Sequence, residues 1–256
     1  MFAYLRRGNA YEEVRPGTTE LDVTRSKPKL RTNAMWKTSL SWLLTTLCLF
    51  FSSGALASCP PEGYDSVSPF DLDKYVGDPW YVLQQLPISY QPLEELYCVR
   101  AQYAKTEARG IFKSRRGDAQ VSVLNSASRG SVEGEPFTAE LLAIVPDIND
   151  PSKLAVGPTF LPSILYGPYW VVAAGPSDTD RYEYAIVTGG PPTVEAADGC
   201  TTGTGINNSG FWLFSRTALP PNREELVEEL RGIAEGLGLD TSVLVDVPQE
   251  GCTYPQ

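Results

Sequence analysis

The feature that most constrains the fold is a long series of short β-type runs that begins near Phe70. Runs rich in Val, Ile, Tyr and Thr alternate there with turn sequences such as Arg116-Gly117-Asp118 and Gly189-Gly190-Pro191. The eight runs begin at Trp80, Tyr97, Ala119, Pro136, Lys153, Tyr169, Arg181 and Gly210. Eight consecutive antiparallel strands without an intervening helix close most simply into a barrel, because closure removes the two exposed sheet edges. The sequence therefore predicts an all-β fold, an eight-stranded antiparallel up-and-down barrel.

One amphipathic helix is expected after the eighth run. The segment PPNREELVEELRGIAEGLG offers Asn222 as N-cap with Glu225 three residues later, and Gly236 and Gly238 end the helical pattern. Its predicted apolar stripe consists of Leu226, Leu230, Ile233 and Leu237. Because strand side chains fill the inside of the barrel, this C-terminal helix is expected to pack against the outside.

The first 57 residues read as a targeting segment. Residues 35–57 contain a basic residue, the apolar run of TSLSWLLTTLCLFFSSGALA and a small-residue cleavage site at Ala55-Leu56-Ala57. The sequence predicts an N-terminal extension with a signal peptide over 1–57 and a domain over 58–256. The protein is accordingly expected to be secreted.

Three alternatives stay open at this end of the chain. Residues 40–57 could just cross a bilayer core of ~30 Å as an uncleaved anchor. Residues 1–34 are either a long cytosolic n-region or follow an upstream start that is not used. The sequence Leu56-Ala57-Ser58-Cys59 also fits a bacterial lipobox, which would place the protein in the periplasm or, as a lipoprotein anchored through Cys59, on the outer membrane.

Composition excludes several functional classes. The chain has no histidine, which removes the usual general base, Ser-His-Asp and Cys-His nucleophile pairs, and most zinc sites. The formal net charge is −10, and the residues after position 57 carry 13 basic and 27 acidic side chains, a net charge of −14. Nucleic-acid binding requires clustered Lys and Arg, so no nucleic acid is expected as a partner.

The cysteines indicate disulfides. Cys48 lies in the predicted signal peptide, and an even number remains in the exported chain. These are Cys59, Cys98, Cys200 and Cys252. Four cysteines allow three pairings, and the residues alone do not choose among them.

Four motifs in sequence order resemble those of the lipocalins, within the branch that contains apolipoprotein D and the bacterial and plant stress lipocalins. They are FDLDKYVGDPWYVLQQLP from Phe70, TDRYEYAIV from Thr179, FWLFSRT from Phe211 and GLGLDTSVLVDVPQ from Gly236. Together they cover nearly the whole of residues 58–252. The chain departs from the first motif by one extra residue before the tryptophan, in Gly77-Asp78-Pro79-Trp80.

The resemblance assigns structural roles to residues of the barrel's closed end. It implies that Trp80 plugs this end and that the guanidinium of Arg216 stacks on its ring, a contact worth ~1 to 2 kcal/mol when desolvated. It also implies the disulfides Cys59–Cys200 and Cys98–Cys252. Neither Trp80 nor Arg216 is expected to take part in chemistry.

The interior of such a barrel is expected to be a cup for one small ligand. With Trp80 and Arg216 facing inward, strand alternation places Val82, Gln84, Trp212 and Phe214 inward too. The resemblance adds Tyr103 and Tyr169 as pocket aromatics. The predicted ligand-binding residues are Val82, Gln84, Tyr103, Tyr169, Trp212 and Phe214. The alternative is that these side chains simply fill a packed core.

The mouth of the cup is expected to carry three further features. Ile88, Tyr90 and Leu93 form an apolar lid or an ordinary solvated loop. Residues 159–168, TFLPSILYGP, are apolar enough to line the mouth or to contact a membrane or partner. Asn207 opens a glycosylation sequon, used if a eukaryotic secretory pathway makes the chain.

The sequence thus favours a secreted carrier that binds a small lipophilic ligand non-covalently, without catalytic residues, metal or cofactor. The candidate ligands are a fatty acid or lysolipid, a sterol-like compound, a retinoid or carotenoid, or a tetrapyrrole. A lipidated envelope protein that handles membrane phospholipid is the first alternative. A lipid-modifying enzyme is the second, and it would require a free thiol or a pair of acids in the cup. The oligomeric state is open.

Overall fold

A computed structural model describes residues 58–106 and 120–255 of the chain. The predicted signal peptide and the rest of the N-terminal extension lie outside the described residues. The whole connection between the second and third strands, residues 107–119, also lies outside them.

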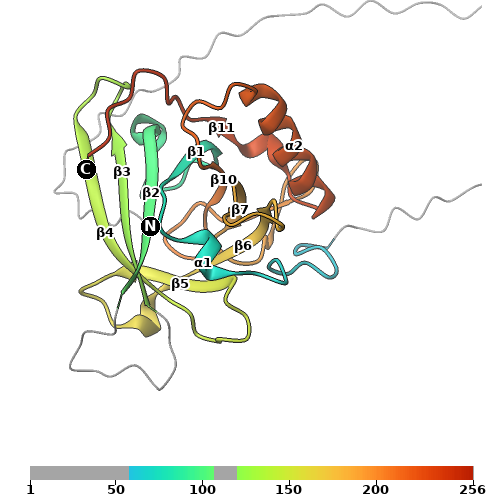
Figure 1. Cartoon of the computed structure of the whole chain (residues 1–256). Helices are drawn as coiled ribbons and strands as arrows, with labels where there is room; N and C mark the ends of the chain where they lie inside the picture. The colour runs from blue at the N-terminus through green and yellow to red at the C-terminus, as the bar shows by residue number, and fades with distance from the viewer. Residues whose placement is uncertain (1–57, 107–119, 256) are drawn as a thin grey trace, which may run out of the picture. The chain divides into compact units, whose positions relative to one another are not determined.

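Eight strands form a closed antiparallel barrel, in which each strand pairs with its neighbour in the chain and the last pairs with the first (Figure 1). The barrel strands are β1 (Trp80–Gln85), β2 (Tyr97–Thr106), β3 (Gln120–Ser128), β4 (Pro136–Ile144), β5 (Lys153–Pro158), β6 (Gly167–Gly175), β7 (Tyr184–Thr188) and β10 (Phe211–Ser215). Pairing of Tyr81 with Ser215 and of Val82 with Phe214 closes the barrel. The predicted eight-stranded up-and-down barrel is confirmed.

Short elements decorate the connections. Two of them, β8 (Val194–Glu195) and β9 (Cys200–Thr201), pair with each other between β7 and β10, whereas β11 (Val245–Asp246) adds to β1 outside the barrel. The single-turn 3₁₀ helices are η1 (Leu93–Glu95), η2 (Ser163–Leu165) and η3 (Thr241–Val243). The strand connections alternate between the two barrel ends, so the β1–β2, β5–β6 and β7–β10 connections share one end, the mouth.

The helix α2 (Arg223–Gly236) packs against the outside of the barrel, as predicted (Figure 1). Its buried side chains are Val227, Leu230 and Ala234, which join a second apolar cluster with outward-facing Leu83, Ile186 and Leu213. The predicted stripe faces the barrel, since Leu226, Ile233 and Leu237 pack, partly buried, against the same cluster as Leu230. Val227 and Ala234 belong to the buried face as well, and the prediction had not included them. Asn222 occupies the N-cap position, but its side chain makes no capping hydrogen bond.

The closed end is plugged as expected. Trp80 is fully buried, and the guanidinium carbon of Arg216 lies 3.6 Å from its ring centroid. Arg216 also donates hydrogen bonds to backbone carbonyls of the segment around α1 (Leu72–Tyr75), including Tyr75 at 2.8 Å, and to that of Tyr182 at 3.0 Å. One side chain thus holds the first strand, the preceding turn and the β6–β7 connection together.

Both disulfides have the pairing that the resemblance implied. Cys59 bonds to Cys200 of β9, and Cys98 of β2 bonds to Cys252 in the tail. The first ties the amino-terminal end of the described chain to the β7–β10 connection, and the second ties the carboxyl-terminal tail to β2. Among the described residues, no helix combines the length and apolar character needed to cross a membrane.

Candidate functional site

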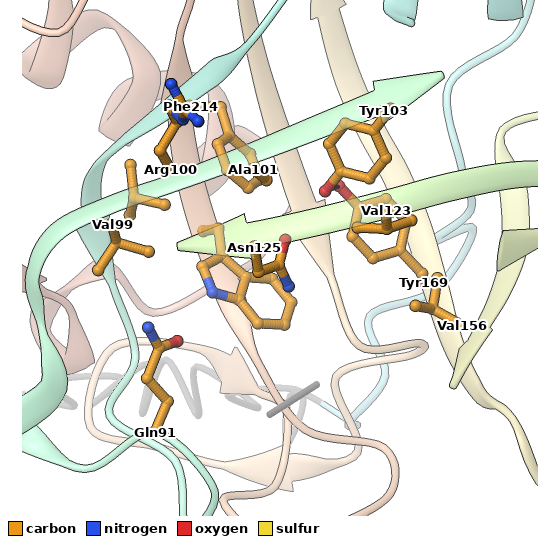
Figure 2. A pocket seen from close by; sticks show the side chains of 12 residues that line it. Gln91, Val99, Arg100, Ala101, Tyr103, Val123, Asn125, Val156, Tyr169 and Phe214 are labelled. Carbon is orange, nitrogen blue, oxygen red and sulfur yellow. Dashed lines mark hydrogen bonds between the residues drawn. The ribbon is translucent and has the colours of Figure 1, made fainter. Parts of the chain in front are cut away.

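A cavity of about 40 Å³, here called the inner cavity, lies inside the barrel (Figure 2). Its lining residues are Val82, Gln91, Val99, Arg100, Ala101, Tyr103, Val123, Asn125, Val156, Tyr169, Trp212 and Phe214. Most of this lining is apolar or aromatic, as is usual for small-molecule sites. Five of the six predicted ligand-binding residues line it: Val82, Tyr103, Tyr169, Trp212 and Phe214.

The sixth, Gln84, was wrongly placed. Its amide nitrogen donates to Asp246 at 3.0 Å and its oxygen accepts from Arg231 of α2 at 2.8 Å, both outside the barrel. The reason is a β-bulge between Val82 and Gln84, across which the partner strand advances only from Phe214 to Leu213. An extra residue in one strand interrupts the alternation of inward and outward side chains.

The position that Gln84 was expected to fill belongs to Gln85. This residue pairs across the ladder with inward-facing Trp212, and paired residues of antiparallel strands share a face. Gln85 is fully buried, and its amide nitrogen donates to the side-chain oxygen of Gln91 at 3.0 Å. Because of the bulge, Gln85 faces the barrel interior and Gln84 faces outward.

Three tyrosine hydroxyls meet at the closed-end side of the inner cavity. The hydroxyl of Tyr169 lies 2.6 Å from that of Tyr75 and 2.8 Å from that of Tyr103. Burial raises the pKa of Tyr103 to about 12, and it raises the pKa values of Tyr75 and Tyr169 well above their usual range. The cluster therefore stays neutral at physiological pH and can only donate or accept hydrogen bonds.

The polar residues at the other side were not predicted. Gln91 comes from the β1–β2 connection. Two backbone hydrogen bonds between Ile88 and Gln91 form a tight turn there, and the side chain of Gln91 points from this turn to the inner cavity. Asn125 of β3 follows inward-facing Val121 and Val123 at alternate positions, so strand alternation could have found it. No sequence signal identifies Gln91, because its direction depends on the turn. Tyr75 was present in the first lipocalin-like motif but had been given no role.

A second, smaller cavity of about 20 Å³, the outer cavity, lies at the mouth. Its lining includes Tyr90, Ile206 and Ser209 of the mouth connections and Pro168 near the start of β6. Val156, Tyr169 and Trp212 line both cavities, and the rings of Tyr169 and Trp212 are stacked with centroids 6.3 Å apart. These side chains form the partition between the two cavities.

The mouth is covered by the β1–β2 connection. Ile88 is buried and Tyr90 is partly buried over the outer cavity, whereas Leu93 is 59% exposed and takes no part in the cover. The backbone N–H of Ser89 donates to the carbonyl of Thr204 at 2.8 Å, which ties this connection to the one before β10. A two-loop cover thus closes the barrel above Trp212.

The apolar β5–β6 connection points to solvent. Phe160 is 78% exposed, Ile164 is 88% exposed and Leu165 is 57% exposed. Asn207 of the sequon is exposed in the connection before β10. Within the described residues there is no group of three or more His, Cys, Asp or Glu that could hold a metal ion.

No protein-family model and no curated protein sequence matches the chain. Among solved structures, the chain is similar to lobster apocrustacyanin A1, at 16% identity over 71% of this chain and 81% of that one, with a TM-score of 0.46. It is also similar to insecticyanin from the tobacco hornworm Manduca sexta, at 20% identity over 77% of this chain and 93% of that one, again with a TM-score of 0.46. At these identities and scores neither structure informs the ligand of this chain.

Proposed function

We propose that this protein is a secreted lipocalin-type carrier that binds a small hydrophobic ligand non-covalently inside its barrel. The observation that carries the proposal is the inner cavity: aliphatic and aromatic side chains surround it, and neutral polar groups stand at both of its ends. Burial of an apolar ligand there would contribute roughly 25 cal/mol per Å². The four ordered motifs support assignment to the lipocalins and to the apolipoprotein D branch.

The ligand-bound barrel must be wider than the one described. Ligand sites of drug-sized molecules enclose roughly 300–1,000 Å³, whereas the inner and outer cavities measure about 40 and 20 Å³. Rotation of the Trp212 indole out of the partition would join the two cavities, and displacement of the two-loop cover would open them to solvent. Ligand uptake in this proposal therefore requires side chains and loops at the mouth to move.

The disulfides support export, since such bonds persist in oxidising compartments. They also weigh against the lipoprotein alternative, because Cys59 in a disulfide has no thiol to carry a lipid. All four cysteines of the described chain are bonded, and no Asp or Glu is among the residues that line the inner cavity. These features favour binding over catalysis.

In a eukaryotic host, the exposed Asn207 would carry a glycan.

A lipid surface is the second proposed contact. Residues 159–168 contain no charged side chain, and three of their large apolar side chains are exposed. A patch of this kind at the mouth would hold the barrel against a lipid layer during ligand exchange. The acidic charge of the remaining surface favours neutral over anionic lipid.

The first experiment is native mass spectrometry on protein purified from its own source without detergent, followed by denaturation and extraction. A stoichiometric lipophilic compound would support the carrier and name its ligand class. In parallel, fatty acids, lysolipids, sterols, retinoids, carotenoids and bilins are titrated against tryptophan fluorescence. Quenching should persist in Trp170→Phe, whose ring lies outside the barrel beside Tyr64, and fall in Trp212→Phe. An empty protein that responds to none of these compounds would refute the carrier.

A further inference from the structure

Three buried amide atoms have no hydrogen-bond partner, and two of them belong to residues that line the inner cavity. They are the side-chain oxygen of Gln85, the side-chain nitrogen of Gln91 and the side-chain oxygen of Asn125. Gln85 and Gln91 are 0% and 1% exposed. A buried polar atom without a partner is unfavourable, because folding removes it from water without replacing the lost hydrogen bond. The unpaired atoms of Gln91 and Asn125, which line one cavity, therefore favour a bound group that satisfies them.

The two glutamines act as one unit. The nitrogen of Gln85 donates to the oxygen of Gln91, which leaves the nitrogen of Gln91 free at the cavity. A concerted flip of both amides keeps the bond between them and turns the free donor of Gln91 into a free acceptor. This glutamine pair can therefore offer either polarity to a group in the cavity.

Asn125 supplies the complementary contact from the barrel wall. Figure 2 shows Gln91 at one side of the lining and the rings of Tyr103 and Tyr169 at the other, with Asn125 between them in this view. Both Asn125 and Gln91 line the same small cavity, which has room for a hydroxyl or an amide group. A ligand group that donates to Asn125 and accepts from Gln91 would satisfy both.

The electrostatics select against a charged group. Among the described residues that line the inner cavity, Arg100 is the only charged one, and its guanidinium faces away. It donates to the carbonyl of Pro255 and lies over the ring of Tyr254, 5.3 Å from the centroid, on the outer side of β2. A carboxylate in the cavity would be buried without a cation, which is strongly unfavourable.

We propose that the glutamine pair and Asn125 form a subsite for a neutral polar group, and that the ligand is a lipophilic alcohol or amide rather than a carboxylate. This inference rests on the proposed carrier function and narrows its ligand class. Of the candidate ligands, free fatty acids and retinoic acid are excluded by it, whereas retinol, sterols and fatty amides fit.

The test compares ligands that differ only in the polar group. Fatty alcohol, primary amide and ionised fatty acid of one chain length, and retinol against retinoic acid, are titrated at neutral pH by tryptophan quenching. The neutral members should bind at least about tenfold tighter than the acids, the order expected for satisfying rather than stranding buried partners. Gln91→Leu and Asn125→Leu should remove this preference, whereas Gln102→Leu, on the outer face of β2, should keep it.

The outcomes separate the two proposals. Acids that bind as tightly as alcohols, or a preference that survives both Gln91→Leu and Asn125→Leu, would overturn the neutral subsite and leave the carrier intact. Absence of binding by both ligand series would overturn the carrier and the subsite together. Asn125→Leu changes a strand and Gln91→Leu changes a loop, so the two variants carry different risks of misfolding. Thermal unfolding identifies which variant is folded, and the ligand preference of that variant decides the outcome.

Discussion

The indole of Trp212 lies directly against the backbone of Gly210, so closely that a Cβ at position 210 would stand 1.8 Å from Cη2 of the ring. Gly210 also has a φ of +107°, a conformation that other residues rarely adopt. One glycine therefore permits both the turn into β10 and the ring position that separates the inner and outer cavities.

Gly210→Ala should move the indole of Trp212 out of this position. Because the backbone conformation is also unsuitable for alanine, we expect a loss of more than about 1 kcal/mol in the free energy of unfolding. The tryptophan emission should shift to longer wavelength, and the affinity for the natural ligand should change. Gly205→Ala is the control, since a Cβ there meets nothing within 4 Å. An unchanged emission spectrum in Gly210→Ala would show that the ring does not depend on the glycine.

Arg216→Lys should destabilise the barrel although it keeps the charge. Lysine cannot stack a planar group on Trp80 or reach the carbonyls of Tyr75 and Tyr182 together. We expect a loss of roughly 3 kcal/mol, from ~2 kcal/mol of cation–π energy and about 1 kcal/mol or more from unpaired carbonyls. Urea unfolding measures it, and Arg181→Lys, at an exposed ion pair, should change stability by less than about 1 kcal/mol. Equal effects of both substitutions would contradict the structural role of Arg216.

Alkaline pH should unfold the protein through its tyrosine cluster. Burial raises the pKa of Tyr103 from 10 to about 12, so the fold prefers the neutral form. This contribution is complete below pH 10 and is lost as the pH rises from 10 through 12. Tyrosinate absorbance and circular dichroism recorded together should show the cluster ionising in step with unfolding. In Tyr103→Phe, the slope of stability against pH should fall by up to about 1.4 kcal/mol per unit. Ionisation of the cluster in a folded barrel would refute this.

The chain from Ser58 onward should show no reactive thiol until it is reduced. The disulfides join residues 141 and 154 positions apart, and the chain-entropy model assigns about 5 kcal/mol to loops of this size. Reduction should therefore destabilise the fold. Thiol titration in denaturant, before and after reduction, tests for a reactive thiol, and thermal unfolding with and without reductant measures the loss of stability. A free thiol in the oxidised protein would contradict the pairing and reopen the enzymatic alternative.

Much of the fold could be predicted because its signals are local. Alternating apolar runs separated by turn residues gave all eight barrel strands, and the amphipathic pattern gave α2. The inward direction of Val82 and Phe214 follows from the same alternation, and the two residues pair across the barrel closure. The disulfide pairing and the Trp80–Arg216 stack required the family resemblance, since they join positions more than 100 residues apart.

The errors at the site have identifiable physical causes. Gln84 was misplaced because a bulge depends on how two strands pair, which no single strand records. Gln91 was missed because a turn in a connection sets its direction. The small size of the cavities depends on side-chain packing, in particular on Trp212 lying over Gly210, and composition carries no information about this.

The exposed β5–β6 connection should bind lipid surfaces. Transfer of Phe160 and Ile164 from water into a lipid layer is worth up to about 1.5–3 kcal/mol for each side chain, because both are largely exposed in the free protein. Cosedimentation with neutral phosphatidylcholine vesicles should therefore fall at least about tenfold in the double variant Phe160→Ser/Ile164→Ser.

The barrel provides a matched control for this prediction. Ile148 is 62% exposed in the β4–β5 connection, at the end opposite to the mouth, so Ile148→Ser removes a similar apolar side chain from the wrong end. Vesicle binding should be unchanged in this variant. Equal losses in both variants would indicate general surface hydrophobicity, and no loss in the double variant would refute the contact. Because the charge after residue 57 is −14, anionic vesicles should bind more weakly than neutral ones at low salt, and this difference should shrink as salt screens the repulsion.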